Sequence, residues 1–174
     1  MSYNYNYKEN GSFGSHQKSS VQTEERPKTD TEKHIATVNE RMREVKTELG
    51  TRAIMHDASK LVNPELKTFD EYGPALKGLT YGSSDYKKCL ENMAPALKHH
   101  YENNRHHPEH FENGVRDMSL IDLIEMLVDW KAATERHADG DLAKSLEYNQ
   151  KRFNMSDELT ALLTRTARDL KWIK

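Results

Sequence analysis

Apolar residues recur every three or four positions along most of this chain, which is the spacing of one face of an α-helix. The first stripe of this kind consists of His34, Val38, Met42, Val45 and Leu49. Thr31 precedes the stripe as a candidate N-cap, and Gly50 follows it as a stop signal. The pattern predicts a helix between Thr31 and Gly50, with His34 on the side that faces the core.

The same period returns in most of the segments that follow. The further helices that it predicts lie at residues 54–60, 64–72, 86–100, from 119 onward, 141–153 and 157–171. Gly73-Pro74 should close the helix at 64–72, residues 77–84 should form a loop, and Pro95 should kink its helix or begin a new one. The stripe of the helix at 86–100 places His100 inward, and Ser119 with Asp122 three residues later forms an approximate capping box. No segment alternates apolar and polar residues as a strand does. The predicted fold class is therefore all-α, a single helical bundle.

The first 29 residues contrast with these helical segments. They consist mainly of Asn, Tyr, Ser, Gly, Lys and Gln and contain almost no aliphatic side chain, so they cannot bury enough apolar surface to order themselves. With 174 residues in all, the chain is too short for two domains of ordinary size. We therefore expect a disordered polar tail over residues 1–29 and one helical domain over residues 30–174.

Composition narrows the classes of function. The formal net charge is −2 and the sequence pI is near 6.5, which gives no overall basic field for nucleic acid or an anionic membrane. Cys89 is the one cysteine, so an internal disulfide and a cysteine-based zinc cluster are both excluded, as suits a reducing cytosol. No apolar run is long enough for a membrane span or a signal core. We expect a cytoplasmic protein without membrane contact.

Histidine and aspartate residues gather in a way that indicates metal binding. His56-Asp57 places an imidazole and a carboxylate on adjacent backbone positions, and five more histidines lie within the twelve residues 99–110. Neutral imidazoles together with carboxylates suit Mn, Fe, Co, Ni or Zn, and Mg is a further candidate. The ligands that we predict for one divalent ion are His34, His56, Asp57 and Asp129.

The surroundings of these ligands are compatible with metal-assisted hydrolysis. Asp129 comes at the end of the apolar face of the helix after Ser119, where a lone carboxylate is costly without a metal or cation. A metal held there would lower the pKa of a bound water and polarise a phosphoryl or carbonyl oxygen, so that hydrolysis is the natural outcome. Lys60 follows Asp57 by about one helical turn, within reach of a substrate phosphate. Arg105 and Lys131 are further candidates for phosphate contact.

The order His34, then His56-Asp57, then Asp129 resembles that of the HD superfamily of metal-dependent phosphohydrolases, which has an all-helical fold. Residues 56–60 are similar to the HDxxK segment of several HD branches, and residues 127–133 to their terminal aspartate helix. Residues 99–109 read HHxxxNxHHxE, which is similar to a family of small, uncharacterised phage and bacterial HD-like proteins. The resemblance implies an HD-like helical domain that hydrolyses a nucleotide or other small phosphate ester by metal-activated water. For a phage-encoded protein the host cytoplasm would be its location.

The chain departs from the family pattern at one point. Binuclear HD branches place an extra histidine between the HD pair and the later histidine pair, whereas residues 58–98 contain none. Glu65 is a candidate substitute, and the site is expected to hold either one ion or two. The residues predicted for a second ion or for the substrate are Glu65, His100, His106 and His107. Those predicted to act in catalysis are Asp57, Lys60, His99 and His100.

Two other classes of function stay open. A non-catalytic HD-like module that binds metal and a nucleotide and regulates a partner is compatible with the polar tail and the missing histidine. An HNH-type nuclease is indicated by His99-His100 followed by Asn104 and His106. That fold needs a hairpin before its helix, whereas this region shows a helical stripe, and the near-neutral pI argues against a nuclease. The oligomeric state stays open at this point.

Overall fold

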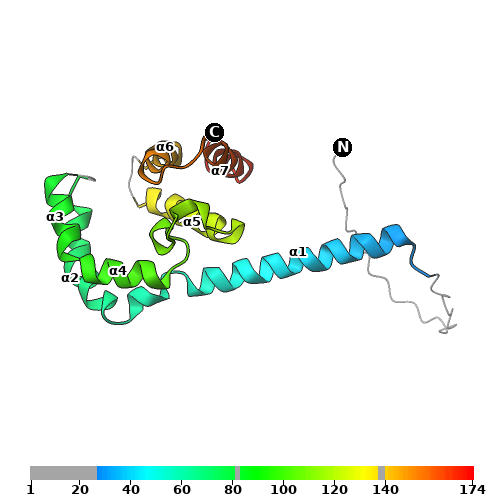
Figure 1. Ribbon diagram of the computed structural model, residues 1–174, viewed down its shortest axis with the longest axis horizontal. Coiled ribbons are helices and arrows are strands. Elements are labelled where there is room, and N and C mark those ends of the chain that lie inside the picture. Colours follow the sequence, from blue (N-terminus) through cyan, green and yellow to red (C-terminus); the bar gives the residue numbers. More distant parts are fainter. Residues whose placement is uncertain (1–26, 81–82, 137–139) are drawn as a thin grey trace, which may run out of the picture. The chain divides into compact units, whose positions relative to one another are not determined.

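The computed structural model describes residues 27–80, 83–136 and 140–174, and every regular element in these ranges is helical (Figure 1). The α-helices are α1 (Asp30–Met55), α2 (Glu65–Lys77), α3 (Ser84–Asn92), α4 (Ala94–Asn103), α5 (Leu120–Thr134), α6 (Leu142–Arg152) and α7 (Asp157–Asp169). Three short 3-10 turns are η1 (Ala58–Leu61), η2 (Pro108–His110) and η3 (Gly114–Arg116). The prediction of an all-α fold is confirmed. The predicted tail, except for residues 27–29, lies outside the described residues.

The chain divides into two units, Met1–Asn39 and Glu40–Lys174, and the candidate site lies in the second. Within the second unit, α1 ends later than the sequence predicts. It passes through Gly50 and continues to Met55, and a 3-10 turn replaces the helix expected at 54–60. A glycine inside a helix costs only about 1 kcal/mol relative to alanine. Arg52, two residues past Gly50, is tied to the buried Asp122, which holds the end of the helix in place.

The apolar stripe of α1 does not face a core. This helix, which is described over its whole length, contains no buried residue, and His34 is exposed. The expectation that the stripe points inward is therefore wrong for this structure. The physical reason is that the core described below is formed by other helices, which bury their apolar sides against one another. Because His34 belongs to the first unit, its role as a metal ligand stays a prediction.

Two prolines behave differently from each other. Pro74 lies inside α2, so Gly73-Pro74 does not close that helix as predicted. Proline lacks the N–H that would bond to the carbonyl four residues earlier. Pro74 lies in the last turn of α2, so the loss of this one bond does not interrupt a long helix. Pro95 is in the first turn of α4, directly after α3 ends, where its fixed φ suits the start of a helix. Of the two outcomes expected for Pro95, the structure has the start of a new helix and not a kink.

The main core lies among α5, α6, α7 and the residues just before α5. Ser119 caps α5 through a reciprocal pair of hydrogen bonds with Asp122, as the sequence predicts. The buried members of this core are Val115, Met118, Leu123, Met126, Leu127, Leu142, Leu146, Met155, Leu163 and Ala167. With its apolar side fixed there, α5 can present polar residues on its other side to the candidate site.

A second packing group brings η1, α2, α3 and α4 together. Met93 and Ala96 are fully buried on this side of the molecule, and α4 turns His100 inward, as its stripe predicts, with 2% of the residue exposed. The turn η2 packs against α4, which brings the second histidine pair toward the first. None of the described helices combines the length and the apolar character that crossing a membrane requires.

Candidate metal centre

The His56-Asp57 pair lies in the turn that ends α1. Asp57 has a φ of 54° and a ψ of 17°, the left-handed conformation that few residues other than Gly, Asn and Asp adopt. This conformation stops the helix, so the two neighbouring side chains are not forced to point about 100° apart, as they would on a continuing helix. His56 Nε2 lies 3.6 Å from Asp57 Oδ2. The strained turn thus presents both side chains to one place.

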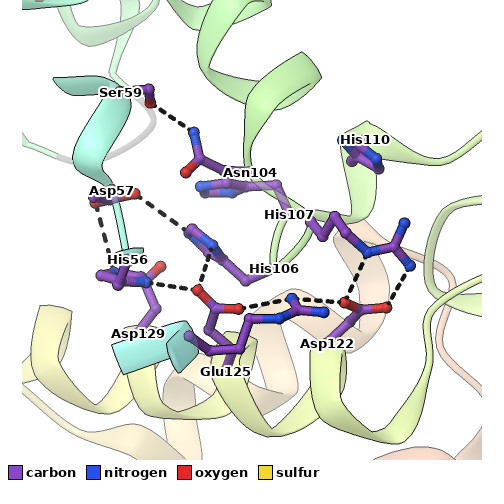
Figure 2. Close-up of polar contacts among 12 residues, drawn as sticks. His56, Asp57, Ser59, Asn104, His106, His107, His110, Asp122, Glu125 and Asp129 are labelled. Atoms are coloured by element: carbon purple, nitrogen blue, oxygen red, sulfur yellow. Dashed lines mark hydrogen bonds and ion pairs between the residues drawn. The ribbon is translucent and has the colours of Figure 1, made fainter. Parts of the chain in front are cut away.

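Asp57 lies against several histidines, and Figure 2 shows its contacts with His56 and His106. Its Oδ1 atom lies 3.4 Å from His100 Nε2 and 3.5 Å from His106 Nε2. His107 Nε2 in turn lies 2.8 Å from His100 Nε2. Asp57 Oδ1 and His106 Nε2 are both buried, and neither finds a hydrogen-bond partner among the described residues. Two buried polar atoms that face each other without a bond indicate a position for a ligand between them.

A second group of donors lies on the other side of the same aspartate. His56 Nε2 is 3.6 Å from Asp129 Oδ1 on α5 and equally far from Asp57 Oδ2. One donor atom from each of His56, Asp57 and Asp129 can share one ion, and so can one from each of Asp57, His100, His106 and His107. Asp57 belongs to both groups. The structure therefore brings together three of the four predicted metal ligands, as well as three of the residues predicted for a second ion.

Two buried carboxylates orient the histidines from behind. Glu125 Oε1 lies 3.0 Å from His56 Nδ1 and 3.1 Å from His106 Nδ1, and Glu65 Oε2 lies 2.8 Å from His100 Nδ1. An ionised carboxylate only accepts hydrogen bonds, so each Nδ1 is the donor. When such a ring is neutral, its lone pair is on Nε2, the atom that faces Asp57. This is the arrangement that fixes metal-ligating histidines in proteins.

Glu125 is itself held by a chain of ion pairs. Its Oε2 atom accepts a bond from Arg52 Nη1 at 3.1 Å, and the same nitrogen bonds Asp122 Oδ1 at 3.0 Å. Asp122 is fully buried and also binds Arg105 through two nitrogens, at 3.2 and 3.0 Å. Two parallel bonds between one guanidinium and one carboxylate are among the stronger charge-assisted contacts. The orientation of His56 and His106 therefore depends on a network that joins α1, α5 and the segment before η2.

The donor atoms that face Asp57 have the separations of a metal site. Around a tetrahedral ion with bonds of about 2.1 Å, neighbouring ligand atoms lie about 3.4 Å apart. The contacts of Asp57 with His56, His100 and His106 span 3.4 to 3.6 Å, which is too long for good hydrogen bonds but right for shared coordination. All donors are imidazole nitrogens or carboxylate oxygens. The residues present thus fit a divalent metal ion.

Charged partners and burial shift the pKa values of the histidines in opposite directions. Contact with Asp129 raises the pKa of His56 to about 9, against the effect of burial, and Glu125 adds to the rise. Burial lowers the pKa of His100 and of His106, and it also lowers the pKa of His107, with neighbouring His106 and His100 adding to the effect. At neutral pH three of the four rings are therefore neutral, the state in which imidazole binds metal.

Both aspartates are ionised. Burial alone would raise the pKa of Asp57, but the hydrogen bond and the charge of Lys60 outweigh it and lower the value. Burial likewise opposes ionisation of Asp129, and contact with His56 outweighs it, so that the pKa of Asp129 is lowered. Two carboxylates that stay negative, beside the three neutral imidazoles and the protonated His56, provide the charge that a divalent cation needs once it displaces the proton of His56.

The other residues predicted for the site lie at different distances from it. Lys60 Nζ binds Asp57 Oδ2 at 2.6 Å, directly beside the cluster. Glu65 and His99 bind each other at 2.7 Å, and Glu65 also binds Nδ1 of His100, the side of that ring away from Asp57. Arg105 is engaged with Asp122, and Lys131 pairs with Glu135 at 2.9 Å. Phosphate contact by Arg105 and Lys131 stays a prediction.

Sequence reasoning missed three residues of the network, namely Arg52, Asp122 and Glu125. A signal for two of them exists in the chain. Asp122, Glu125 and Asp129 follow one another at steps of three and four, which places three carboxylates on one side of α5. For Arg52 there is no such signal, because its partners lie 70 and 73 residues away. By contrast, His110 lies apart from the cluster in Figure 2 and binds the carbonyl of Tyr101 at 2.8 Å.

Fold and site together define an all-α protein with a histidine and carboxylate cluster that can hold a divalent metal ion. The chain belongs to the DUF5662 family, a family of unknown function, whose model matches residues 23–170. Searches of curated proteins and of solved structures give no significant match.

Proposed function

We propose that this chain is a metal-dependent phosphohydrolase of the HD type, which acts on a nucleotide or another small phosphate ester. The observation that carries the proposal is the pair of buried, unbonded atoms, Asp57 Oδ1 and His106 Nε2, within a ring of imidazoles locked from behind by carboxylates. A purely structural cluster would place hydrogen bonds at these positions, since unpaired buried polar groups are unfavourable. The resemblance of residues 56–60 and 99–109 to HD-like proteins adds independent support.

The proposed ligands are His56, Asp57 and Asp129 for one ion, with His100, His106 and His107 available for a second ion or for the substrate. Their nitrogen and oxygen donors suit Mn, Fe, Co, Ni or Zn, and the cluster contains no thiolate. A divalent ion at this position supplies Lewis acidity toward a phosphoryl oxygen and lowers the pKa of a water molecule. The overall reaction is hydrolysis: water adds its oxygen to phosphorus, and the ester oxygen leaves with a proton.

Lys60 is the proposed phosphate-binding residue. Its ammonium group lies beside Asp57 and near the ring of Phe69, and about a third of its side chain is exposed. A positive charge at the open side of the cluster can bind a phosphate oxygen and hold the ester over the ligands. His99, which binds Glu65 and is more exposed than His100, lies at the edge of the cluster, where it can contact the substrate.

The test begins with metal content and a panel of substrates. Purified protein is loaded in turn with Mn, Co, Ni, Fe, Zn and Mg and assayed on nucleotides and generic phosphate esters. Asp57→Asn and His106→Ala should each lower metal content and abolish turnover, because they remove donors at the buried position. His110→Ala is the matched control, since that ring lies in the same segment but outside the cluster. Full metal content in both Asp57→Asn and His106→Ala would overturn the metal centre.

Lys60→Ala separates substrate binding from metal binding. Loss of a charge that binds phosphate equally in the ground and transition states should raise KM and leave metal content unchanged. Lys98→Ala, an exposed lysine paired with Glu102 on α4, should change neither quantity. Metal-loaded protein that hydrolyses nothing in the panel but binds a nucleotide would favour the non-catalytic module instead.

A further inference from the structure

The exposed side of α1 has the pattern of a coiled-coil seam. Ile35, Val38, Met42, Val45 and Leu49 follow one another at steps of three, four, three and four. The first four are 54%, 46%, 63% and 43% exposed. A helix that packs on a core usually carries a wider apolar stripe, whereas this narrow alternation matches the a and d positions of a two-stranded coiled coil. An apolar seam of four turns indicates a surface that another helix covers.

The charges beside the seam distinguish between the two orientations of a helix pair. In a parallel pair, Arg41 would lie against Lys46 of the second helix, and this like-charge contact would occur twice. In an antiparallel pair with Met42 opposite Val45, Arg41 lies against Glu48 of the second helix, again twice. Within α1, Arg41 pairs with Glu44, and this exposed pair is worth little. Glu48 is half exposed, and its partner Arg52 is also held by Asp122 and Glu125. Charge complementarity thus favours an antiparallel partner with the same sequence.

We propose that α1 pairs in antiparallel orientation with α1 of a second copy of this chain, with Met42 of each copy opposite Val45 of the other. Val38 of each copy then packs against Leu49 of the other. The opposed a and d side chains interdigitate along the seam and remove it from water, which is the main source of stability in such a pair.

The same register gives His34 a partner. It places His34 beside Met55 of the second copy, and therefore within about one turn of that copy's His56. His34 is exposed at the start of α1, so the pairing offers this predicted ligand to the metal centre of the other copy. This step rests on the proposed metal centre, whereas the helix pairing does not.

The oligomeric state tests the pairing. Light scattering on a sizing column should give a dimer for the wild-type chain at micromolar concentration. Met42→Glu combined with Val45→Glu should give a monomer with unchanged helical content by circular dichroism. Thr47→Glu, an exposed position of α1 away from the seam, should remain dimeric. A monomeric wild type, or a dimer that survives the double substitution, would overturn the proposal.

Cysteine cross-linking tests the orientation. In the antiparallel register the two copies of Val38 lie 11 residues apart, about 16 Å along the helix, which no disulfide can span. Val38→Cys combined with Leu49→Cys should therefore form a covalent dimer on mild oxidation, and Val38→Cys alone should not. The one native cysteine, Cys89, is buried and should not react. A covalent dimer from Val38→Cys alone would show a parallel pair and overturn the antiparallel arrangement.

The role of His34 is tested separately by metal titration. His34→Ala should weaken metal binding in the dimer and have no effect in the background of the Met42→Glu and Val45→Glu monomer. An effect of equal size in both backgrounds, or in neither, would overturn the shared ligand and leave the dimer itself in place. Loss of the metal centre as a whole would instead appear in Asp57→Asn, so that the two failures are distinguishable.

Discussion

Helices α5 and α1 are both amphipathic, but their surfaces have different surroundings. The apolar side of α5 is buried in the core, and its carboxylates meet the histidine cluster on the other side. Helix α1 contributes Arg52 to the network behind that cluster, while its apolar seam is exposed. The packing of α5 is therefore determined within one chain, whereas the seam of α1 is complete only when another helix covers it. Substitutions on the two helices should differ accordingly.

The largest expected difference is between Leu127→Ala on α5 and Val45→Ala on α1. Leu127 is 1% exposed, and its truncation should lower the free energy of unfolding by about 2–4 kcal/mol. Val45 is 43% exposed, and its truncation should change that quantity by less than about 0.5 kcal/mol at concentrations that dissociate a dimer. Urea denaturation of dilute protein measures both values. Equal losses would mean that the seam of α1 packs within its own chain.

The next effect concerns the buried carboxylate that joins the two helices. Burial alone would raise the pKa of Asp122. Hydrogen bonds from Arg105, Ser119 and Arg52 outweigh this effect and lower the pKa from 3.8 to about 2. A lowered pKa stabilises the folded chain above about pH 4, and this contribution of about 2 kcal/mol is lost as the pH falls from about 4 to about 2.

The free energy of unfolding of the wild type and of Asp122→Asn should be measured from about pH 2 to about pH 6. The variant should be less stable above pH 4 and should lose less stability in acid. Asp85→Asn, exposed in the first turn of α3, is the control and should follow the wild type. Parallel curves for wild type and Asp122→Asn would contradict the assigned ion pairs.

A smaller effect is expected at the residue that orients two histidines at once. Glu125→Gln keeps the size of the side chain but weakens its bonds to His56 Nδ1 and His106 Nδ1. Loss of such a partner typically lowers metal affinity about 10–100-fold. Glu135→Gln, exposed at the C-cap of α5, should leave affinity unchanged. Competition with a chromophoric chelator gives both constants, and an unchanged affinity for Glu125→Gln would rule out its orienting role.

Local signals in the chain predicted much of this fold. The capping box of Ser119 and Asp122 was identified correctly, and the helix start at Pro95 is one of the two outcomes expected for that residue. Both features depend on neighbouring residues alone. The same is true of the inward position of His100, which follows from the stripe on α4. His56, Asp57 and Asp129 were chosen by chemistry, and the structure brings them within reach of one ion.

What could not be predicted depends on distant contacts. Periodicity identified α1 as a helix but could not show that its stripe stays exposed, because the same spacing fits a core and a coiled coil. Arg52 binds residues on α5 that are far away in sequence, and Glu65 turned out to lie behind His100. Both positions follow from how helices pack, which spacing along one helix does not contain.

The smallest predicted effect tests whether α1 is continuous. Gly50 lies inside the helix, and a Cβ added there would meet no atom within 4 Å. Gly50→Ala should therefore raise the free energy of unfolding by up to about 1 kcal/mol, since alanine favours the helix and loses less backbone freedom on folding. If Gly50 instead ended a shorter helix in a left-handed conformation, the same substitution would destabilise the chain. The sign of the shift in the urea midpoint thus decides whether the exposed seam and the His56-Asp57 turn belong to one helix.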